Sequence, residues 1–319
     1  MKLKIGTRGS KLALYQANLV KDKIKQLFDD QNKKIDIEIK TIKTSGDRIL
    51  TASLSNFGGK GLFVKEIEEA LFSEDIDIAV HSLKDVPQVI PEELALGAVL
   101  KRDDPRDCVI LKDKPESDKE LDSVNFASLL KNHAIVGTSS LRRRALLARF
   151  RDDIIFEPLR GNIDTRLGKL RDGFFDAIVL SSSGLIRLNL SSNIDVYLDP
   201  LTFIPQCGQG AIVIEYKSAR ADIGEIIKPL NDEDTKFSVF AERACIKGLN
   251  CGCASPVGAY SYIEGNDVHI KGFVSNTYGE YLEDGVTGKK IDYENVGKKL
   301  ALSLINKGGF EILSKNTIL

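Results

Sequence analysis

Arginine side chains are concentrated in one part of the chain. Eight of the fifteen arginines fall within residues 136–171, although the formal net charge of the whole protein is only −1. Two short apolar runs in and beside this stretch each lead into a polar turn and then a helical pattern. A helix start offers free N–H groups to an anion, and guanidinium groups match carboxylate or phosphate oxygens. The stretch therefore predicts an anion site near Arg143 and Arg166, the alternative being a solvated helix face paired with Asp152 or Asp153.

A lone carboxylate forms a second candidate group. Asp85 follows the strand pattern of residues 77–80, and Lys84 lies beside it. Ligands of open α/β sheets gather at the carboxyl ends of the strands, and Lys84 can hold Asp85 ionised or bind an anion beside it. A single carboxylate among basic groups suits the stabilisation of a cation that appears during a reaction, unlike the paired carboxylates of a glycosidase. The alternative is that Asp85 caps a turn before Pro87.

The five cysteines show no metal-ligand spacing with the three histidines, so we expect no metal site. Cys251 and Cys253 lie in a glycine-bearing loop after a helical pattern. A loop cysteine near a basic cleft can be a nucleophile or a covalent attachment point, because nearby cations lower the pKa of its thiol. No histidine close in sequence can act as its base, so an unreactive thiol stays the alternative. Cys108 and Cys245 lie within element patterns and are predicted to be buried.

The composition is that of an ordinary globular protein. The 319 residues are 42% hydrophobic and 29% charged, which is enough for two or three domains. No apolar run approaches the ~20 residues that span a bilayer, and the first residues lead into a strand pattern without the features of a signal peptide. A net charge near zero disfavours a general nucleic-acid binder. We therefore expect a soluble, cytoplasmic protein without membrane or nucleic-acid partners.

The elements that position the candidate groups follow a βα order. Residues 3–5 and 35–40 have strand patterns and residues 11–28 carry a helical apolar stripe, which predicts a parallel sheet with helices over it. Arg8 lies in the first strand-to-helix turn, where ligands of such sheets bind, and Ser10 is suited to cap the helix.

A long polar and glycine-rich segment, residues 44–61, follows the second strand pattern. A loop of this length inside a compact domain is usually functional or mobile. It is interpreted as a lid, with a disordered connector as the alternative.

Two crossovers divide the chain into domains. The charged segment 102–107 leads into a second βα series, in which Arg187 also follows a strand end, and segment 204–210 leads back to a buried-type strand. Beyond residue 230, helical patterns over 235–249 and 293–305 flank three alternating strand patterns, over 257–263, 268–274 and 278–283. This order predicts a small α+β domain with an antiparallel sheet. The predicted fold class is α/β, with two domains forming a bilobed clamp around a cleft and this third domain. The boundaries are 1–102 with 208–228, then 103–207, then 229–319.

Together these stretches resemble the porphobilinogen deaminase family, also called hydroxymethylbilane synthases. Eight segments in the family's order carry the resemblance: 7–14, 58–66, 77–87, 102–107, 136–143, 159–166, 208–211 and 252–258. The resemblance implies two α/β domains like those of periplasmic binding proteins. It also implies a dipyrromethane cofactor, built from two porphobilinogen units and held by a thioether. Cys253 stands in the family's Gly-Cys-x-x-Pro-x-Gly setting and is the implied attachment residue, while Cys251 replaces a more usual glycine.

The implied reaction joins four porphobilinogen molecules head to tail, with loss of ammonia each time, before hydrolysis releases hydroxymethylbilane. Asp85 would bond the pyrrole N–H groups and stabilise the positive azafulvenium that forms as the amine leaves. Phe63 would stack on a pyrrole ring. By motif match, the acetate and propionate groups would be bound by Arg8, Ser10, Lys84, Ser140, Arg142, Arg143, Arg160, Arg166 and Arg187.

Porphobilinogen is the expected partner, and the expected state is a monomer. Two other classes of function stay open from the residues alone. One is a non-catalytic bilobed anion-binding protein, because fold alone does not fix function. The other is a nucleotide or RNA binder, which lacks support because the sequence has no phosphate loop ending in Lys-Ser/Thr.

Overall fold

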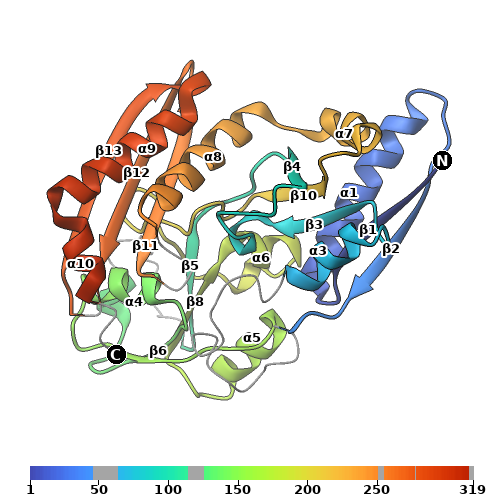
Figure 1. Cartoon of the computed structure of the whole chain (residues 1–319). Helices are drawn as coiled ribbons and strands as arrows, with labels where there is room; N and C mark the ends of the chain where they lie inside the picture. Colours follow the sequence, from blue (N-terminus) through green and yellow to red (C-terminus); the bar gives the residue numbers. More distant parts are fainter. Residues whose placement is uncertain (46–63, 114–125, 251–254, 277, 316–319) are drawn as a thin grey trace. The chain divides into compact units, whose positions relative to one another are not determined.

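The computed structural model describes residues 1–45, 64–113, 126–250, 255–276 and 278–315 (Figure 1). The predicted lid lies almost wholly outside these ranges, as do Phe63, Cys251 and Cys253. The chain forms two compact units, one of residues 1–103 with 211–237 and the other of residues 104–210 with 238–319. The three-domain boundaries stay a prediction.

Unit 1 is built on a five-stranded sheet of order β2-β1-β3-β10-β4. Its strands β1, β2 and β3 are parallel, and β10 runs antiparallel to both β3 and β4. Leu3, Ile5 and Ile78 of the sheet pack with Val20 and Ile24 of α1 in one buried core. The elements of this unit are β1 (Lys2–Arg8), α1 (Lys11–Asp29), β2 (Asp36–Ile42), α3 (Lys65–Phe72), β3 (Ile78–Ser82), the 3-10 turn η2 (Leu83–Asp85), β4 (Leu94–Val99), β10 (Ile212–Lys217), α7 (Ala221–Ile227) and η5 (Lys228–Leu230).

Unit 2 contains a second five-stranded sheet with the same topology, of order β7-β6-β8-β5-β9. Here β6, β7 and β8 are parallel, and β5 runs antiparallel to β8 and β9. In each sheet the strand that follows a crossover, β10 or β5, runs antiparallel to both of its neighbours. The two matching sheets confirm the predicted pair of α/β domains. The elements are β5 (Asp107–Leu111), η3 (Phe126–Leu129), β6 (Ile135–Gly137), α4 (Leu141–Ala148), β7 (Ile155–Glu157), α5 (Ile163–Arg171), β8 (Ala177–Ser181), α6 (Ser182–Arg187), η4 (Ser191–Asn193) and β9 (Val196–Tyr197).

The C-terminal part forms an antiparallel sheet of order β11-β12-β13, which confirms the predicted α+β character. Gly297 of α9 lies so close to α8 that an added Cβ would meet the carbonyl oxygen of Ala241 at 2.1 Å. Phe273 of β12 belongs to the core of the second α/β sheet, so sheet and α/β layer share one unit. The elements are α8 (Glu233–Gly248), β11 (Val257–Glu264), β12 (Asp267–Ser275), β13 (Tyr281–Lys289), η6 (Lys290–Asp292), α9 (Tyr293–Leu304), η7 (Ile305–Gly309) and α10 (Phe310–Ser314).

The third strand begins later than the alternating pattern from residue 278 suggests. The side-chain oxygen of Asn276 accepts hydrogen bonds from the backbone N–H groups of Tyr278 and Glu280, both at 3.0 Å. These bonds hold residues 278–280 in a turn, so β13 starts at Tyr281.

Candidate functional site

The anion-binding candidates of unit 2 follow three parallel strands. Helix α4 begins after β6, α5 after β7 and α6 after β8. Because the carboxyl ends of parallel strands meet at one edge of the sheet, these helix starts lie at the same edge. The structure therefore brings together, along this edge, the elements that carry Ser140, Arg142, Arg143, Arg160, Arg166 and Arg187.

The first turn of α4 is shaped by side-chain capping. Ser140 is the N-cap, and its hydroxyl accepts a hydrogen bond from the backbone N–H of Arg143 at 3.4 Å. Its own backbone N–H donates to the Thr138 hydroxyl at 3.2 Å. These bonds hold the backbone that carries Arg142 and Arg143, whose side chains are both buried.

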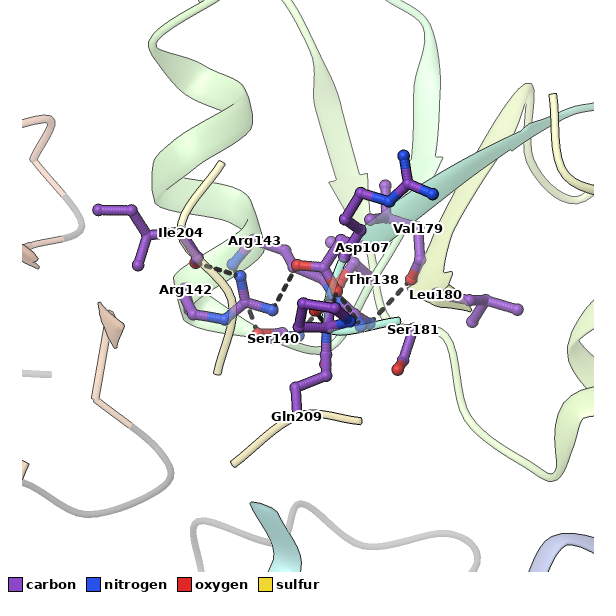
Figure 2. A network of polar contacts seen from close by, with 12 residues as sticks. Asp107, Thr138, Ser140, Arg142, Arg143, Val179, Leu180, Ser181, Ile204 and Gln209 are labelled. Atoms are coloured by element: carbon purple, nitrogen blue, oxygen red, sulfur yellow. Dashed lines mark hydrogen bonds and ion pairs between the residues drawn. The ribbon is translucent and has the colours of Figure 1, made fainter. Parts of the chain in front are cut away.

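Both guanidinium groups bind one carboxylate, that of Asp107 (Figure 2). Arg142 Nη2 lies 2.6 Å from Oδ2, while Arg143 Nη2 and Nε lie 2.7 and 3.1 Å from Oδ1. Gln209 Nε2 also donates to Oδ1, at 3.0 Å. Asp107 was assigned to a crossover from the sequence, but it opens β5 and is fully buried. Two of the predicted carboxylate-binding arginines thus have an acidic partner within the protein.

Burial raises the pKa of the Asp107 carboxyl, but the charges of Arg142 and Arg143 outweigh it. Together with hydrogen bonds from Arg143 and Gln209, they hold this pKa well below its ordinary value. Burial lowers the pKa of Arg142, which the Asp107 charge opposes, and a guanidinium stays charged in either case. One negative and two positive charges therefore leave one unit of positive charge in the network.

Backbone geometry also fixes the turn between β7 and α5. Asn162 caps α5 by accepting a hydrogen bond from the Thr165 N–H at 2.9 Å. Gly161 has a φ of 110°, a region that side chains with a Cβ rarely adopt, and its carbonyl accepts from Arg166 Nε at 2.8 Å. Arg160 and Arg166 are both half-buried. Arg187, at the end of α6, is buried and donates to the Gly210 carbonyl at 2.7 Å.

The candidates of unit 1 lie at the carboxyl ends of two neighbouring parallel strands. Arg8 ends β1, and Ser10 caps α1 by accepting the Ala13 N–H at 3.2 Å, as predicted. Lys84 and Asp85 lie in η2, directly after β3. Asp85 is exposed, and its side chain has no hydrogen bond or ion pair with any residue that the structure describes. It therefore presents a carboxylate that a ligand can use.

A buried pair near Asp85 was not foreseen from the sequence. His81 Nε2 of β3 lies 3.0 Å from Glu215 Oε2 of β10, and both side chains are almost fully buried. The only signal for it was a charged residue inside an otherwise apolar strand pattern. Gln209 was missed in the same way, because its contact with Asp107 joins residues 102 positions apart.

The described cysteines are structural. Cys108 and Cys245 are buried, as predicted, and so is Cys207. Burial raises the pKa of the Cys108 thiol to about 12.

Among the residues described, no group of three or more histidine, cysteine or acidic side chains could hold a metal ion. Nor does any described helix have the length and apolar character needed to cross a membrane.

Comparison with known proteins decides the family. A model described as "Porphobilinogen deaminase, dipyromethane cofactor binding domain" matches residues 3–225, and one described as "Porphobilinogen deaminase, C-terminal domain" matches residues 236–306. The chain belongs to the porphobilinogen deaminase family. Its members are transferases, and the first of the two matched domains is the one that binds the dipyrromethane cofactor.

Curated relatives match over nearly their whole length. A porphobilinogen deaminase of Alkaliphilus metalliredigens is 42% identical over 312 residues, which cover 98% of this chain and 94% of the relative. One of Bacillus subtilis is 40% identical over 316 residues, covering 98% and 96%. Among solved structures, a TRAP periplasmic solute binding protein of Desulfovibrio salexigens is 10% identical with a TM-score of 0.43, covering 74% of each chain. That structural likeness is too distant to carry an argument.

Each unit, taken by itself, presents one kind of group that would suit a ligand with carboxylates and pyrrole N–H groups. The Arg142–Arg143–Asp107 network has surplus positive charge, and the Nε of Arg142 is buried without a hydrogen-bond partner among the described residues. Asp85 offers an exposed hydrogen-bond acceptor. These are the two kinds of group that a dipyrromethane with acidic side chains requires.

Proposed function

We propose that this chain joins four porphobilinogen molecules head to tail onto a dipyrromethane primer, with loss of ammonia each time, and releases hydroxymethylbilane by hydrolysis. The observation that carries the proposal is the match of both family domains, which together span residues 3–306 with a short gap. It favours the enzyme over a non-catalytic anion-binding protein.

Asp85 is the catalytic residue in this proposal. Its exposed carboxylate, at the carboxyl end of β3, accepts hydrogen bonds from pyrrole N–H groups and stabilises the positive charge that forms as ammonia leaves. Lys84 lies next to it in η2, where its ammonium group can bind a substrate carboxylate. The lone carboxylate suits this role because the reaction develops one positive charge on the substrate.

The basic groups bind the acetate and propionate side chains, whose number grows with each condensation. A growing polyanion explains why a nearly neutral protein gathers its arginines in one region. The groups proposed for this role are Arg8, Ser10, Lys84, Ser140, Arg142, Arg143, Arg160, Arg166 and Arg187. Arg142 and Arg143 can contribute through their surplus charge and remaining N–H groups, because part of each fork already binds Asp107.

Cys253 is proposed to hold the primer through a thioether, and Phe63 to stack on a pyrrole ring; both lie outside the described residues. The primer supplies the carbon to which the first porphobilinogen is joined. A monomeric state, a cytoplasmic location and the lack of a nucleic-acid partner stay predictions.

Replacing Asp85 tests the proposal. Asp85→Ala should lower kcat at least about 10²-fold, because the charge that stabilises the developing cation is removed. The variant should stay folded, because the Asp85 side chain has no hydrogen bond or ion pair with a described residue. Glu92→Ala, at an exposed acid in the same unit, should keep its turnover. Normal turnover of Asp85→Ala contradicts the assigned role.

A further inference from the structure

The side chains of Arg142 and Arg143 leave α4 in different directions, because consecutive residues on a helix are about 100° apart. Their guanidinium groups nevertheless meet at the same carboxylate, each on a different oxygen of Asp107. Each arginine is also fixed by a backbone carbonyl: Arg142 Nη1 donates to Ile204 at 2.8 Å, and Arg143 Nη1 to Val179 at 2.9 Å. The Asp107 carboxylate is thus the shared partner that fixes the orientation of both guanidinium groups.

Asp107 is itself held in place. Its backbone carbonyl accepts a hydrogen bond from the Leu198 N–H at 2.9 Å, and β5 pairs it with Ser181 of β8. Gln209 Nε2 donates to Asp107 Oδ1 and to the Pro105 carbonyl, at 3.0 and 2.8 Å. The buried amide of Gln209, which lies beside Asp107 in Figure 2, therefore also ties this carboxylate to the segment that precedes it.

The charge balance of this network points to an anion. Within the part of the chain that the structure describes, Asp107 is the only acidic side chain in contact with either guanidinium. Asp107 and Gln209 have no exposed surface, and Arg142 retains only 4%. Uncompensated charge out of water is costly, so a ligand carboxylate that offsets it is bound favourably. The Nε of Arg142 is also buried without a hydrogen-bond partner among the described residues, so the positive group is not fully satisfied by the protein.

We propose that Asp107 and Gln209 are positioning residues for substrate binding: Asp107 fixes the guanidinium groups of Arg142 and Arg143 and leaves one positive charge for a carboxylate of the pyrrole chain, and Gln209 orients Asp107. This inference rests on the proposed function, because it assumes that these arginines bind porphobilinogen or the primer. It assigns a binding role to two residues that need not touch the ligand.

A double-mutant cycle on loaded enzyme tests the inference. Arg143→Leu should raise KM for porphobilinogen about tenfold, as expected for the loss of a charge-assisted hydrogen bond. Asp107→Asn should raise KM by a similar factor in the native background, but by a clearly smaller factor in the Arg143→Leu background, where only Arg142 is left for Asp107 to orient. If Asp107 has a merely structural role, Asp107→Asn lowers the folded fraction and kcat. KM of the folded enzyme then stays unchanged, and the effects of the two substitutions are additive.

Gln209→Leu provides a milder variant in case Asp107→Asn fails to fold. It removes one donor to Asp107 and should raise KM by about two- to threefold in the native background, and by a smaller factor in the Arg143→Leu background. Asp176→Asn is the matched control, because Asp176 supports the backbone of Ile135 in the same unit without contacting either arginine. Equal KM effects of Asp107→Asn or Gln209→Leu in both backgrounds overturn the inference. If Arg143→Leu itself leaves KM and loading unchanged, the proposed role of the arginine fails instead.

Discussion

His81 and Glu215 form a hydrogen-bonded pair across the antiparallel strands β3 and β10, with 3.0 Å between Nε2 and Oε2. The pair lies in the interior of unit 1, and β3 leads directly into η2 with Lys84 and Asp85. A buried acid that loses its partner, or a buried histidine that loses its acceptor, faces the full cost of desolvation. The pair therefore fixes the strand that positions the proposed catalytic carboxylate.

Glu215→Ala should lower the free energy of unfolding by about 3–5 kcal/mol, because it leaves His81 buried without its acceptor. Urea unfolding measures this loss. The matched control is Glu225→Ala, which breaks an exposed i,i+3 pair with Lys228 in the same unit and should cost less than about 1 kcal/mol. Similar losses for the two variants would show that the buried pair contributes nothing particular.

The ion pairs of Asp107 with Arg142 and Arg143 should make the free energy of unfolding fall as the pH is lowered. The pKa of Asp107 is lowered in the folded state, so this carboxylate contributes stability above its unfolded pKa of about 3.9, and that contribution is lost as the pH falls toward the folded pKa. Asp107→Asn should cost about 3–5 kcal/mol near neutral pH. The gap between the urea midpoints of wild type and variant should narrow progressively below about pH 5.

Asp152→Asn, at an exposed acid of the same unit, serves as the control for this titration and should show a small gap at every pH. A gap for Asp107→Asn that stays constant from neutral to acid conditions would mean that the ion pairs with Arg142 and Arg143 do not carry the stability assigned to them.

Ser10 has two roles that can be separated. Its hydroxyl caps α1, so Ser10→Ala should cost about 1 kcal/mol of stability. If Ser10 also binds a substrate carboxylate, the same variant should raise KM. Asp232→Ala removes a comparable cap, because Asp232 accepts the Thr235 N–H at 2.8 Å, but lies outside the proposed site. Both variants should lose similar stability in thermal unfolding, while only Ser10→Ala shifts KM; equal KM values would leave Ser10 as a cap alone.

Local patterns predicted the elements well, because periodicity and caps are properties of short segments. The apolar stripe over residues 11–28 and the cap at Ser10 correspond to α1, and the helix pattern from Tyr293 corresponds to α9. The start of β13 was misplaced because a single side chain, that of Asn276, draws three residues into a turn.

Contacts between distant segments could not be predicted. The motif match pointed to Arg142 and Arg143. Nothing near them in sequence indicates that Asp107 binds both guanidinium groups, or that Gln209 donates a hydrogen bond to Asp107. Such a network depends on strand pairing between β5 and β8, which brings residue 107 beside residue 181. The sequence thus identified the groups that carry charge, and the fold was needed to identify what holds them.

The central claim is that Cys253 carries a covalent primer of two pyrrole units, and intact-mass measurement tests it most directly. Protein made in cells that supply porphobilinogen should show an adduct of two linked pyrroles, and peptide mapping should locate it on Cys253. The adduct should disappear in Cys253→Ala and persist in Cys251→Ala. An unmodified wild-type chain, or an adduct that survives in Cys253→Ala, would contradict the account.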